Sequence, residues 1–255
     1  MNQLKAPILS AVEAIRGVYL FHLEAPEIAG EAKPGQFVMV RCGKETILPR
    51  PISVHSVDGG QIGLLFSVVG KGTGWLSQKK KGETLDIFGP LGNGYTVFPE
   101  SRNLLLVAGG MGIAPLRFLA DEANKQGKNI TLLMGAQRAI QLLSTELLPH
   151  PMKLVISTDD GSKGNKGPTT LSIPREANQA DQIFACGPIP MYRAMAKMPE
   201  LKDKPCQISL EVRMGCGFGV CYGCTVKTKQ GLKQVCKDGP IFNLRDVLWD
   251  ELVDI

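Results

Sequence analysis

The chain has 255 residues, of which 44% are hydrophobic and 21% are charged, with 29 glycines and 17 prolines. This composition is that of a folded, loop-rich protein and excludes an intrinsically disordered chain. The net charge of +5 comes without a long run of lysine or arginine, so there is no electrostatic case for nucleic-acid binding. The length suits two domains and a small appendage.

The first residues, "MNQLKAPILSAVEAIRG", lack the charged head and the continuous apolar stretch of a secretion signal. No later run approaches the roughly 18 apolar residues of a membrane span. We therefore expect a cytoplasmic protein that does not contact a membrane. Four of the seven cysteines lie between residues 216 and 236, and in a reducing cytosol such a group favours metal ligation over disulfides.

Short strands separated by tight turns are predicted from residue 8 to about residue 98. They are rich in β-branched and aromatic residues and are bounded by Gly, Pro or Asp-Gly. Evenly spaced strands of this kind predict a small antiparallel β-barrel. The predicted strands are residues 18–26, 36–42, 51–57, 61–69 and 83–90.

The pattern changes at residues 101–137, where an apolar run, a glycine turn, a helical pattern and a second apolar run predict a β-α-β unit. Further buried strands are predicted at 153–158 and 182–187, the second followed by a helix, so we expect a parallel, doubly wound sheet. The predicted multi-domain organisation is a β-barrel over residues 1–99, an α/β domain over 100–208 and a small cysteine-rich segment over 209–255.

The cysteine-rich segment contains "MGCGFGVCYGC" (214–224) and continues to a fourth cysteine. The spacing is Cys216-x4-Cys221-x2-Cys224-x11-Cys236, the arrangement of plant-type 2Fe–2S clusters, in which four thiolates hold two bridged irons. The intervening glycines allow backbone N–H groups to point at sulfur. We therefore predict a 2Fe–2S site. A structural zinc site is the alternative, although zinc sites usually pair two C-x2-C knuckles and only one is present.

A second motif, "LLLVAGGMGIAPL" (104–116), places a glycine turn between a predicted strand and a predicted helix. Gly109, Gly110 and Gly112 would let a pyrophosphate approach the helix N-terminus, where free N–H groups and the helix dipole favour an anion. The motif departs from G-x-G-x-x-G, so a tight turn without a ligand is an open alternative.

The end of the strand at 153–158 continues into "STDDGS" (157–162). A carboxylate here, from Asp159 or Asp160, can accept hydrogen bonds from ribose hydroxyls and would repel a 2′-phosphate. The segment therefore predicts NAD rather than NADP, with a solvated turn as the alternative.

Two stretches of the predicted barrel, "LPRPIS" (48–53) and "SVVGKGTGW" (67–75), contain candidate flavin ligands. Arg50 could pair with a phosphate and Ser53 could reach a flavin ring edge. Pyrophosphate donors are available from Gly70, Gly72 and Thr73. Composition alone favours turn-stabilising roles for these residues.

The order of these motifs, together with "GPLGNGY" (89–95) and "CGPIPM" (186–191), resembles the ferredoxin–NADP reductase superfamily over residues 1 to about 205. The resemblance implies FAD on the barrel and a nicotinamide nucleotide on the α/β domain. By this resemblance, Arg50, Pro51, Ile52 and Ser53 border the isoalloxazine and ribityl chain, Leu65, Phe66, Ser67 and Val68 lie along the flavin, and Gly72 and Thr73 bind its pyrophosphate. The implied nicotinamide site consists of Gly110, Gly112, Cys186, Gly187 and Pro188. One departure is Phe66-Ser67, where the family often has Tyr-Arg.

The cysteine loop narrows the resemblance to the electron-transfer subunits of NAD-dependent, type B dihydroorotate dehydrogenases. That family implies FAD, a 2Fe–2S cluster and NAD as cofactors. It also implies an FMN-containing catalytic partner, in a heterotetramer with two copies of each subunit, that acts in pyrimidine synthesis. Two alternatives stay open: a ferredoxin- or hydrogenase-linked NAD(P)H reductase of the same architecture, and a non-enzymatic, zinc-stabilised interaction module.

Electron relay needs no general base, and we predict no catalytic side chain of that kind. The three histidines, in strand or loop contexts, are predicted to be structural: His22, His55 and His150. The rim of the cysteine loop carries apolar side chains, Phe218, Val220 and Tyr222, which suit contact with a partner protein. Shielding of the cluster from water is the alternative role.

Overall fold

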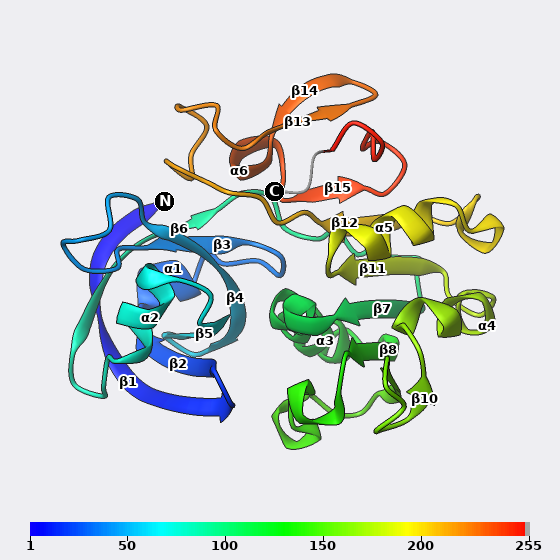
Figure 1. Cartoon of the computed structure of the whole chain (residues 1–255), viewed down its shortest axis with the longest axis horizontal. Helices are drawn as coiled ribbons and strands as arrows, with labels where there is room; N and C mark the ends of the chain where they lie inside the picture. Colours follow the sequence, from blue (N-terminus) through cyan, green and yellow to red (C-terminus); the bar gives the residue numbers. More distant parts are fainter. Residues whose placement is uncertain (253–255) are drawn as a thin grey trace.

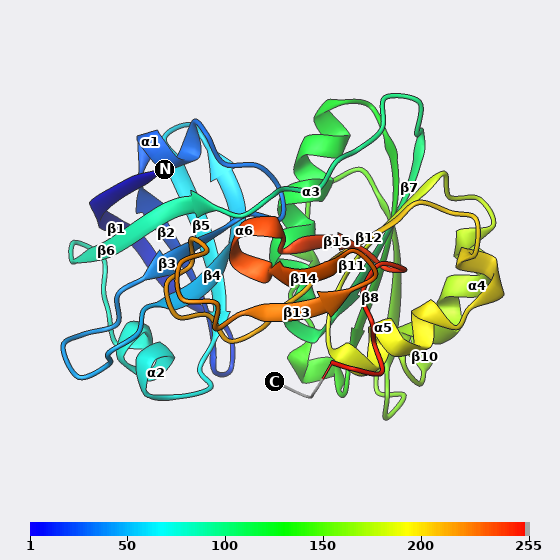
Figure 2. The same ribbon diagram turned by 90° about the horizontal axis from the view of Figure 1, so that it is seen from above.

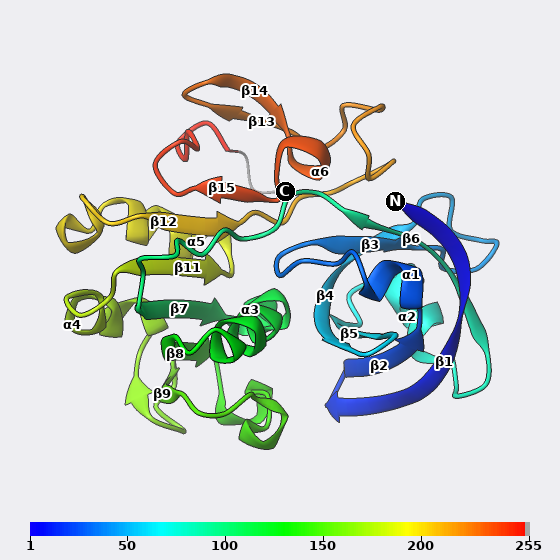
Figure 3. The same ribbon diagram turned by 180° about the vertical axis from the view of Figure 1, so that it is seen from behind.

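A closed β-barrel and a mostly parallel β-sheet lie side by side in the computed structural model, which describes residues 1–252 (Figure 1). The cysteine-rich segment, coloured orange and red, lies along one edge of both (Figures 1 and 3). Among the helices of residues 1–252, none is long and apolar enough to cross a membrane.

The barrel contains six antiparallel strands in the order β1-β2-β5-β4-β3-β6, which confirms the predicted barrel. The first strand was not predicted. It pairs with β6 at Asn2–Pro7 and with β2 from Ile8 onward, so it bends around the barrel. More buried and more exposed residues alternate from Asn2 to Leu9, but the register shifts between Ile8 and Ser10 and the alternation is lost beyond that point. The barrel elements are β1 (Asn2–Ile15), β2 (Val18–Glu24), α1 (Pro26–Ala29), β3 (Phe37–Val40), β4 (Arg50–Asp58), β5 (Gln61–Ser67), α2 (Lys71–Ser77) and β6 (Thr84–Leu91).

The second sheet has the order β10-β9-β8-β7-β11-β12-β15, with all neighbours parallel except β12 and β15. This confirms the predicted parallel sheet. Its strands are β7 (Asn103–Gly109), β8 (Asn129–Ala136), β9 (Lys153–Thr158), β10 (Asn165–Lys166), β11 (Gln182–Cys186), β12 (Cys206–Ser209) and β15 (Ile241–Asn243). Its helices are α3 (Ile113–Lys125), α4 (Ile173–Ala177) and α5 (Ile189–Ala196), with 3₁₀ turns η1 (Gly110–Gly112), η2 (Ala139–Gln141), η3 (Thr145–Leu147), η4 (Thr169–Ser172) and η5 (Pro199–Leu201).

The cysteine-rich segment forms a hairpin and a short helix before it enters the sheet as β15. Its elements are β13 (Thr225–Thr228), β14 (Gly231–Gln234) and α6 (Val235–Asp238). Seen from above, the hairpin and α6 lie over the junction of barrel and sheet (Figure 2). The segment is therefore placed where it can contact both bodies.

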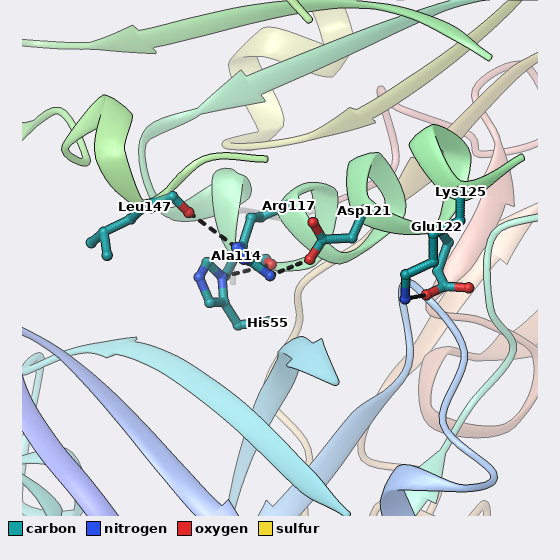
Figure 4. Close-up of polar contacts among 7 residues, drawn as sticks. All are labelled: His55, Ala114, Arg117, Asp121, Glu122, Lys125 and Leu147. Atoms are coloured by element: carbon teal, nitrogen blue, oxygen red, sulfur yellow. Dashed lines mark hydrogen bonds and ion pairs between the residues drawn. The ribbon is translucent and has the colours of Figure 1, made fainter. Parts of the chain in front are cut away.

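Helix α3 joins the two bodies. Phe118 packs with the hydrophobic core of the barrel, and His55 of β4 hydrogen-bonds through Nδ1 to the carbonyl of Ala114 at 3.1 Å (Figure 4). One turn further along, Arg117 pairs with Asp121. These contacts fix the start of α3, which follows the glycine turn, against a strand that carries predicted flavin residues.

Candidate functional site

A cavity of about 450 Å³ opens where the barrel faces the sheet. Strands β4 and β5, which pair with each other, supply one wall of the cavity through residues that include Ser53 and Phe66. The residues predicted to contact flavin that line this cavity are Pro51, Ile52, Ser53, Leu65, Phe66, Ser67 and Thr73. The opposite wall comes from the segment after β12, including Met214.

Three predicted flavin residues, Arg50, Gly72 and Val68, lie outside the lining of this cavity. Arg50 packs against α2: a Cβ built on Gly72 would lie 2.7 Å from Arg50 Nε. The Thr73 hydroxyl accepts hydrogen bonds from the backbone N–H groups of Val69 and Gly70, at 2.9 and 3.2 Å. The Arg50 guanidinium thus packs on the bare backbone of Gly72, an arrangement that we call the barrel cradle. A side chain at position 72 would displace the guanidinium, which is suited to an anionic group such as a flavin pyrophosphate.

A larger cavity, of about 980 Å³, lies at the carboxyl ends of the parallel strands. This is the edge at which open α/β sheets bind ligands. Four of the residues predicted for the nicotinamide site line it together: Gly110 and Gly112 from the turn after β7, and Gly187 and Pro188 from the turn after β11. A Cβ on Gly112 would lie 1.8 Å from the carbonyl oxygen of Cys186, so the close approach of these two turns requires glycine.

The two candidate aspartates after β9 have different surroundings. Asp159 lines the large cavity. Asp160 accepts hydrogen bonds from the backbone and hydroxyl of Ser162, and these bonds lower the pKa of its carboxyl. Asp159 is therefore the carboxylate available to a ligand, whereas Asp160 stabilises its own turn.

The two cavities adjoin, because Ser67, Met111 and Glu211 line both. Cys186 does not line either cavity: it is fully buried, and its thiol lies 3.9 Å from a carboxylate oxygen of Glu211. Burial raises the pKa of the Cys186 thiol well above its usual value and also raises the pKa of the Glu211 carboxyl. A ligand in the flavin cavity can thus contact a ligand in the nucleotide cavity where the two cavities adjoin. The buried, neutral thiol of Cys186 lies next to this boundary.

The four predicted cluster cysteines converge in the loop before β13 and in α6. Cys224 and Cys236 are buried with their sulfurs 3.3 Å apart, whereas Cys221 is exposed and hydrogen-bonds to the half-buried Cys216. The thiols therefore form an inner and an outer pair. Two thiolates for each of two irons is the donor set of a 2Fe–2S cluster.

Backbone N–H groups point at these sulfurs. Gly219 donates to Cys236 Sγ at 3.1 Å and Val220 donates to Cys216 Sγ at 3.3 Å. Burial would raise the pKa of the Cys216 thiol, but the N–H groups around it outweigh that effect and lower the pKa to about 6. These N–H groups thus stabilise the Cys216 sulfur in its thiolate form, which is the form that binds metal. Burial and the neighbouring Cys224 thiol instead raise the pKa of the Cys236 thiol to about 12.

A single-ion site is a poorer fit. Within residues 1–252, no three or more His, Cys, Asp or Glu side chains are arranged to hold one metal ion. Structural zinc needs four ligands around one centre, whereas a two-iron cluster needs two pairs. The paired thiols therefore favour the iron–sulfur prediction over the zinc alternative.

The cysteine loop packs directly on the wall of the flavin cavity. Cys224 and Cys236 share a hydrophobic cluster with Phe37 and Met214, which both line that cavity. A Cβ on Gly217 would lie 2.5 Å from Met39 Cγ of β3. The predicted cluster site is thus separated from the flavin cavity only by packed side chains.

The chain is similar to known proteins along most of its length. The model of the iron–sulfur cluster binding domain of dihydroorotate dehydrogenase B matches residues 211–248. A protein of Desulforamulus reducens named dihydroorotate dehydrogenase B (NAD(+)), electron transfer subunit, is 38% identical over 96% of this chain and 98% of its own length. A protein of the same name from Caldanaerobacter subterraneus subsp. tengcongensis is 36% identical over 97% and 99%. The chain belongs to the family of dihydroorotate dehydrogenase B electron transfer subunits.

Solved structures agree with this family and its fold. The NADH-dependent reduced ferredoxin-NADP oxidoreductase, described for flavin-based electron bifurcation, matches with a TM-score of 0.88 and 33% identity over 98% of this chain and 92% of that one. A ferredoxin–NADP⁺ reductase from Neisseria gonorrhoeae, solved with FAD and NADP, has the same fold, with a TM-score of 0.64 at 17% identity over 76% and 89%. The predicted superfamily resemblance is confirmed.

Several residues that line the larger cavity were not singled out from the sequence, and Arg16, Met111 and Glu211 are among them. Met111 lies inside the glycine motif, so the motif located it without assigning a contact. Glu211 follows β12 and Arg16 occupies a hairpin turn, and neither position has a sequence signature. Only the packing of the barrel against the sheet brings these two side chains to the cavities.

Proposed function

We propose that this chain is the electron transfer subunit of an NAD-dependent dihydroorotate dehydrogenase. It passes electrons from an FMN-containing catalytic subunit, which oxidises dihydroorotate in pyrimidine synthesis, to NAD⁺. One observation carries the proposal: the flavin cavity adjoins the nucleotide cavity on one side and the cysteine loop on the other. When bound, a 2Fe–2S cluster exchanges single electrons, nicotinamide exchanges a hydride, and FAD mediates between the two.

The residues of the chain position these groups. The walls of β4 and β5 hold the flavin ring, and Arg50 with Gly72 holds its pyrophosphate. The turns at Gly112 and Gly187 bring the nicotinamide to the shared boundary of the two cavities, at Met111. The thiolates of Cys216, Cys221, Cys224 and Cys236 bind the cluster.

Asp159 selects NAD over NADP in this proposal, because its carboxylate accepts hydrogen bonds from ribose hydroxyls and repels a 2′-phosphate. The proposal also includes a heterotetramer with two copies of each subunit, and a cytoplasmic location.

The test compares the isolated chain with the reconstituted complex. The purified chain should reduce an artificial dye with NADH, and more efficiently than with NADPH. It should not oxidise dihydroorotate until an FMN-containing dihydroorotate dehydrogenase subunit is added, because the flavin that takes electrons from dihydroorotate belongs to that subunit in this proposal. Dihydroorotate-dependent NAD⁺ reduction by the chain alone would refute the relay.

A second candidate is a ferredoxin-linked NAD(P)H reductase subunit. The 33% identity and high structural similarity to the NADH-dependent reduced ferredoxin-NADP oxidoreductase favour it. The same assay with added reduced ferredoxin separates the two functions. Ferredoxin-dependent NAD⁺ reduction would support this second candidate if a cognate dihydroorotate dehydrogenase subunit brings no dihydroorotate-dependent NAD⁺ reduction.

A further inference from the structure

The charges that line the nucleotide cavity are unbalanced. Asp159 contributes an exposed carboxylate, Glu211 contributes a carboxyl whose pKa is raised, and Arg16 is the only Lys or Arg side chain among the described residues of the lining. A dinucleotide adds two negative charges through its pyrophosphate. Backbone N–H groups at the glycine turn offset part of this charge, but a dianion bound near the Asp159 carboxylate calls for a cation.

Arg16 is held at the cavity by the barrel. It lies in the turn between β1 and β2, and its neighbours Ile15 and Val18 line the same cavity and pack against the core of the nucleotide domain. Figure 1 shows this hairpin, in blue, ending beside that domain. The backbone of Gly17 donates to Glu13 Oε1 at 2.7 Å and accepts from Val68 at 2.9 Å. The turn is therefore anchored on both sides of the guanidinium-bearing residue.

The Arg16 side chain is available to a ligand. It is exposed, and it forms no ion pair with another side chain of residues 1–252. Ser67, which pairs with Val18 across β2 and β5, lines the same corner of the cavity and carries no charge. A guanidinium is suited to phosphate because it can donate two parallel hydrogen bonds to its oxygens.

We propose that Arg16 binds the pyrophosphate of NAD(H), so that the flavin barrel supplies the cation for a nucleotide held by the other domain. This assignment deepens the proposed function and rests on NAD(H) being the occupant of the large cavity. Arg16 is a binding residue: it contributes affinity and leaves the alignment of nicotinamide with flavin to the turns at Gly112 and Gly187.

The test is an equilibrium measurement on the purified, FAD-containing chain. The Kd values of NAD⁺, NADPH and ADP-ribose are measured by calorimetry for the wild type, Arg16→Gln and Arg16→Lys. All three ligands contain the pyrophosphate, and ADP-ribose lacks nicotinamide. Arg16→Gln should raise each Kd by about tenfold to a hundredfold, the loss expected when a charge-assisted hydrogen bond to phosphate is removed. Arg16→Lys should recover part of the loss.

The matched control is Arg41→Gln, which removes the same charge from an exposed arginine that pairs with Asp86 on the barrel and does not line the cavity. It should leave every Kd unchanged. The rate of dye reduction at saturating NADH should also be unchanged in Arg41→Gln. Added salt should weaken NAD⁺ binding less in Arg16→Gln than in the wild type.

Unchanged Kd values in Arg16→Gln would overturn the proposal, as would a loss confined to NADPH, which would place Arg16 at the 2′-phosphate. Equal losses in Arg16→Gln and Arg41→Gln would also overturn it, because the effect would then be one of net charge. If the wild type binds none of these nucleotides, the nucleotide assignment itself fails. If it binds them and Arg16→Gln does so equally well, only the role of Arg16 fails.

Discussion

At the scale of single residues, the cysteines of the loop are the predicted cluster ligands, whereas other buried cysteines are not. Replacing Cys236 by Ser should remove most of the iron and the visible iron–sulfur absorption while FAD stays bound, since the loop and the barrel cradle are built from different segments. Cys206→Ser is the control, because Cys206 is buried in the same hydrophobic cluster but lies outside the cysteine loop and is not one of the paired thiols. Iron retained in Cys236→Ser but lost in Cys206→Ser would contradict the ligand assignment.

His55 makes the stability of the fold sensitive to acid. Burial, with the nearby Arg117 cation, lowers the pKa of its ring to about 3, so Nδ1–H donates to the carbonyl of Ala114 in the neutral form. An unfolded chain takes up a proton near pH 6.5, but the folded chain does not. Folding stability is therefore lost as the pH falls from 6.5 toward 3, at about 1.4 kcal/mol per pH unit.

The variant His55→Asn keeps a donor near the Ala114 carbonyl and removes the titrating ring. Between pH 6.5 and pH 5, the wild type should lose about 2 kcal/mol more of its free energy of unfolding than this variant does. Denaturant unfolding at several pH values measures the difference. Equal acid dependence in the two proteins would show that His55 titrates normally in the folded state.

At the scale of elements, the turn into α2 is shaped to leave Arg50 in place. The Gly72→Ala variant would put a methyl group against Arg50 Nε and displace the guanidinium, so FAD affinity should fall by about tenfold. Gly74→Ala is the matched control: Gly74 lies in the same helix, is not a predicted flavin ligand, and an added Cβ there would only contact Val68 Cγ1 at 3.9 Å. FAD retained after dialysis is the measurement, and equal retention in the two variants would contradict a role for Arg50 in holding FAD.

At the scale of the whole molecule, the rim of the cysteine loop is the proposed contact with the catalytic subunit. Phe218, Val220 and Tyr222 are 46%, 66% and 70% exposed next to the outer thiol pair. Val220→Asp should weaken complex formation with the dihydroorotate dehydrogenase subunit by at least about tenfold, because a charge would be buried in an apolar contact. Dye reduction by the isolated variant should be unchanged.

The control for the rim is Val12→Asp, at an exposed valine of β1 that is 57% accessible. Size-exclusion chromatography and dihydroorotate-dependent NAD⁺ reduction measure assembly and coupling. If both variants assemble equally well, the contact lies elsewhere. If Val220→Asp bleaches the cluster in the isolated chain, these side chains shield the cluster instead.

The sequence by itself determined the elements and motifs whose physics is local. Strands β2 to β6 and the parallel strands β7, β8, β9 and β11 follow from runs of β-branched and apolar residues between turn signals, and the cysteine spacing follows from the reach of one loop around two irons. The long strand β1 was missed because its two halves pair with different neighbours and a register shift between Ile8 and Ser10 interrupts its alternating pattern.

Only the tertiary structure decided which residues of the barrel and of the parallel-sheet domain come together. It separated Asp159 from Asp160, placed Cys186 outside the lining of the cavities, and brought Arg16 and Glu211 into the lining of the larger cavity. The physical reason is that a local pattern records which face of an element is buried, whereas a site between two bodies depends on how α3 and the β1–β2 hairpin pack, and that packing is set by contacts between residues far apart in the chain.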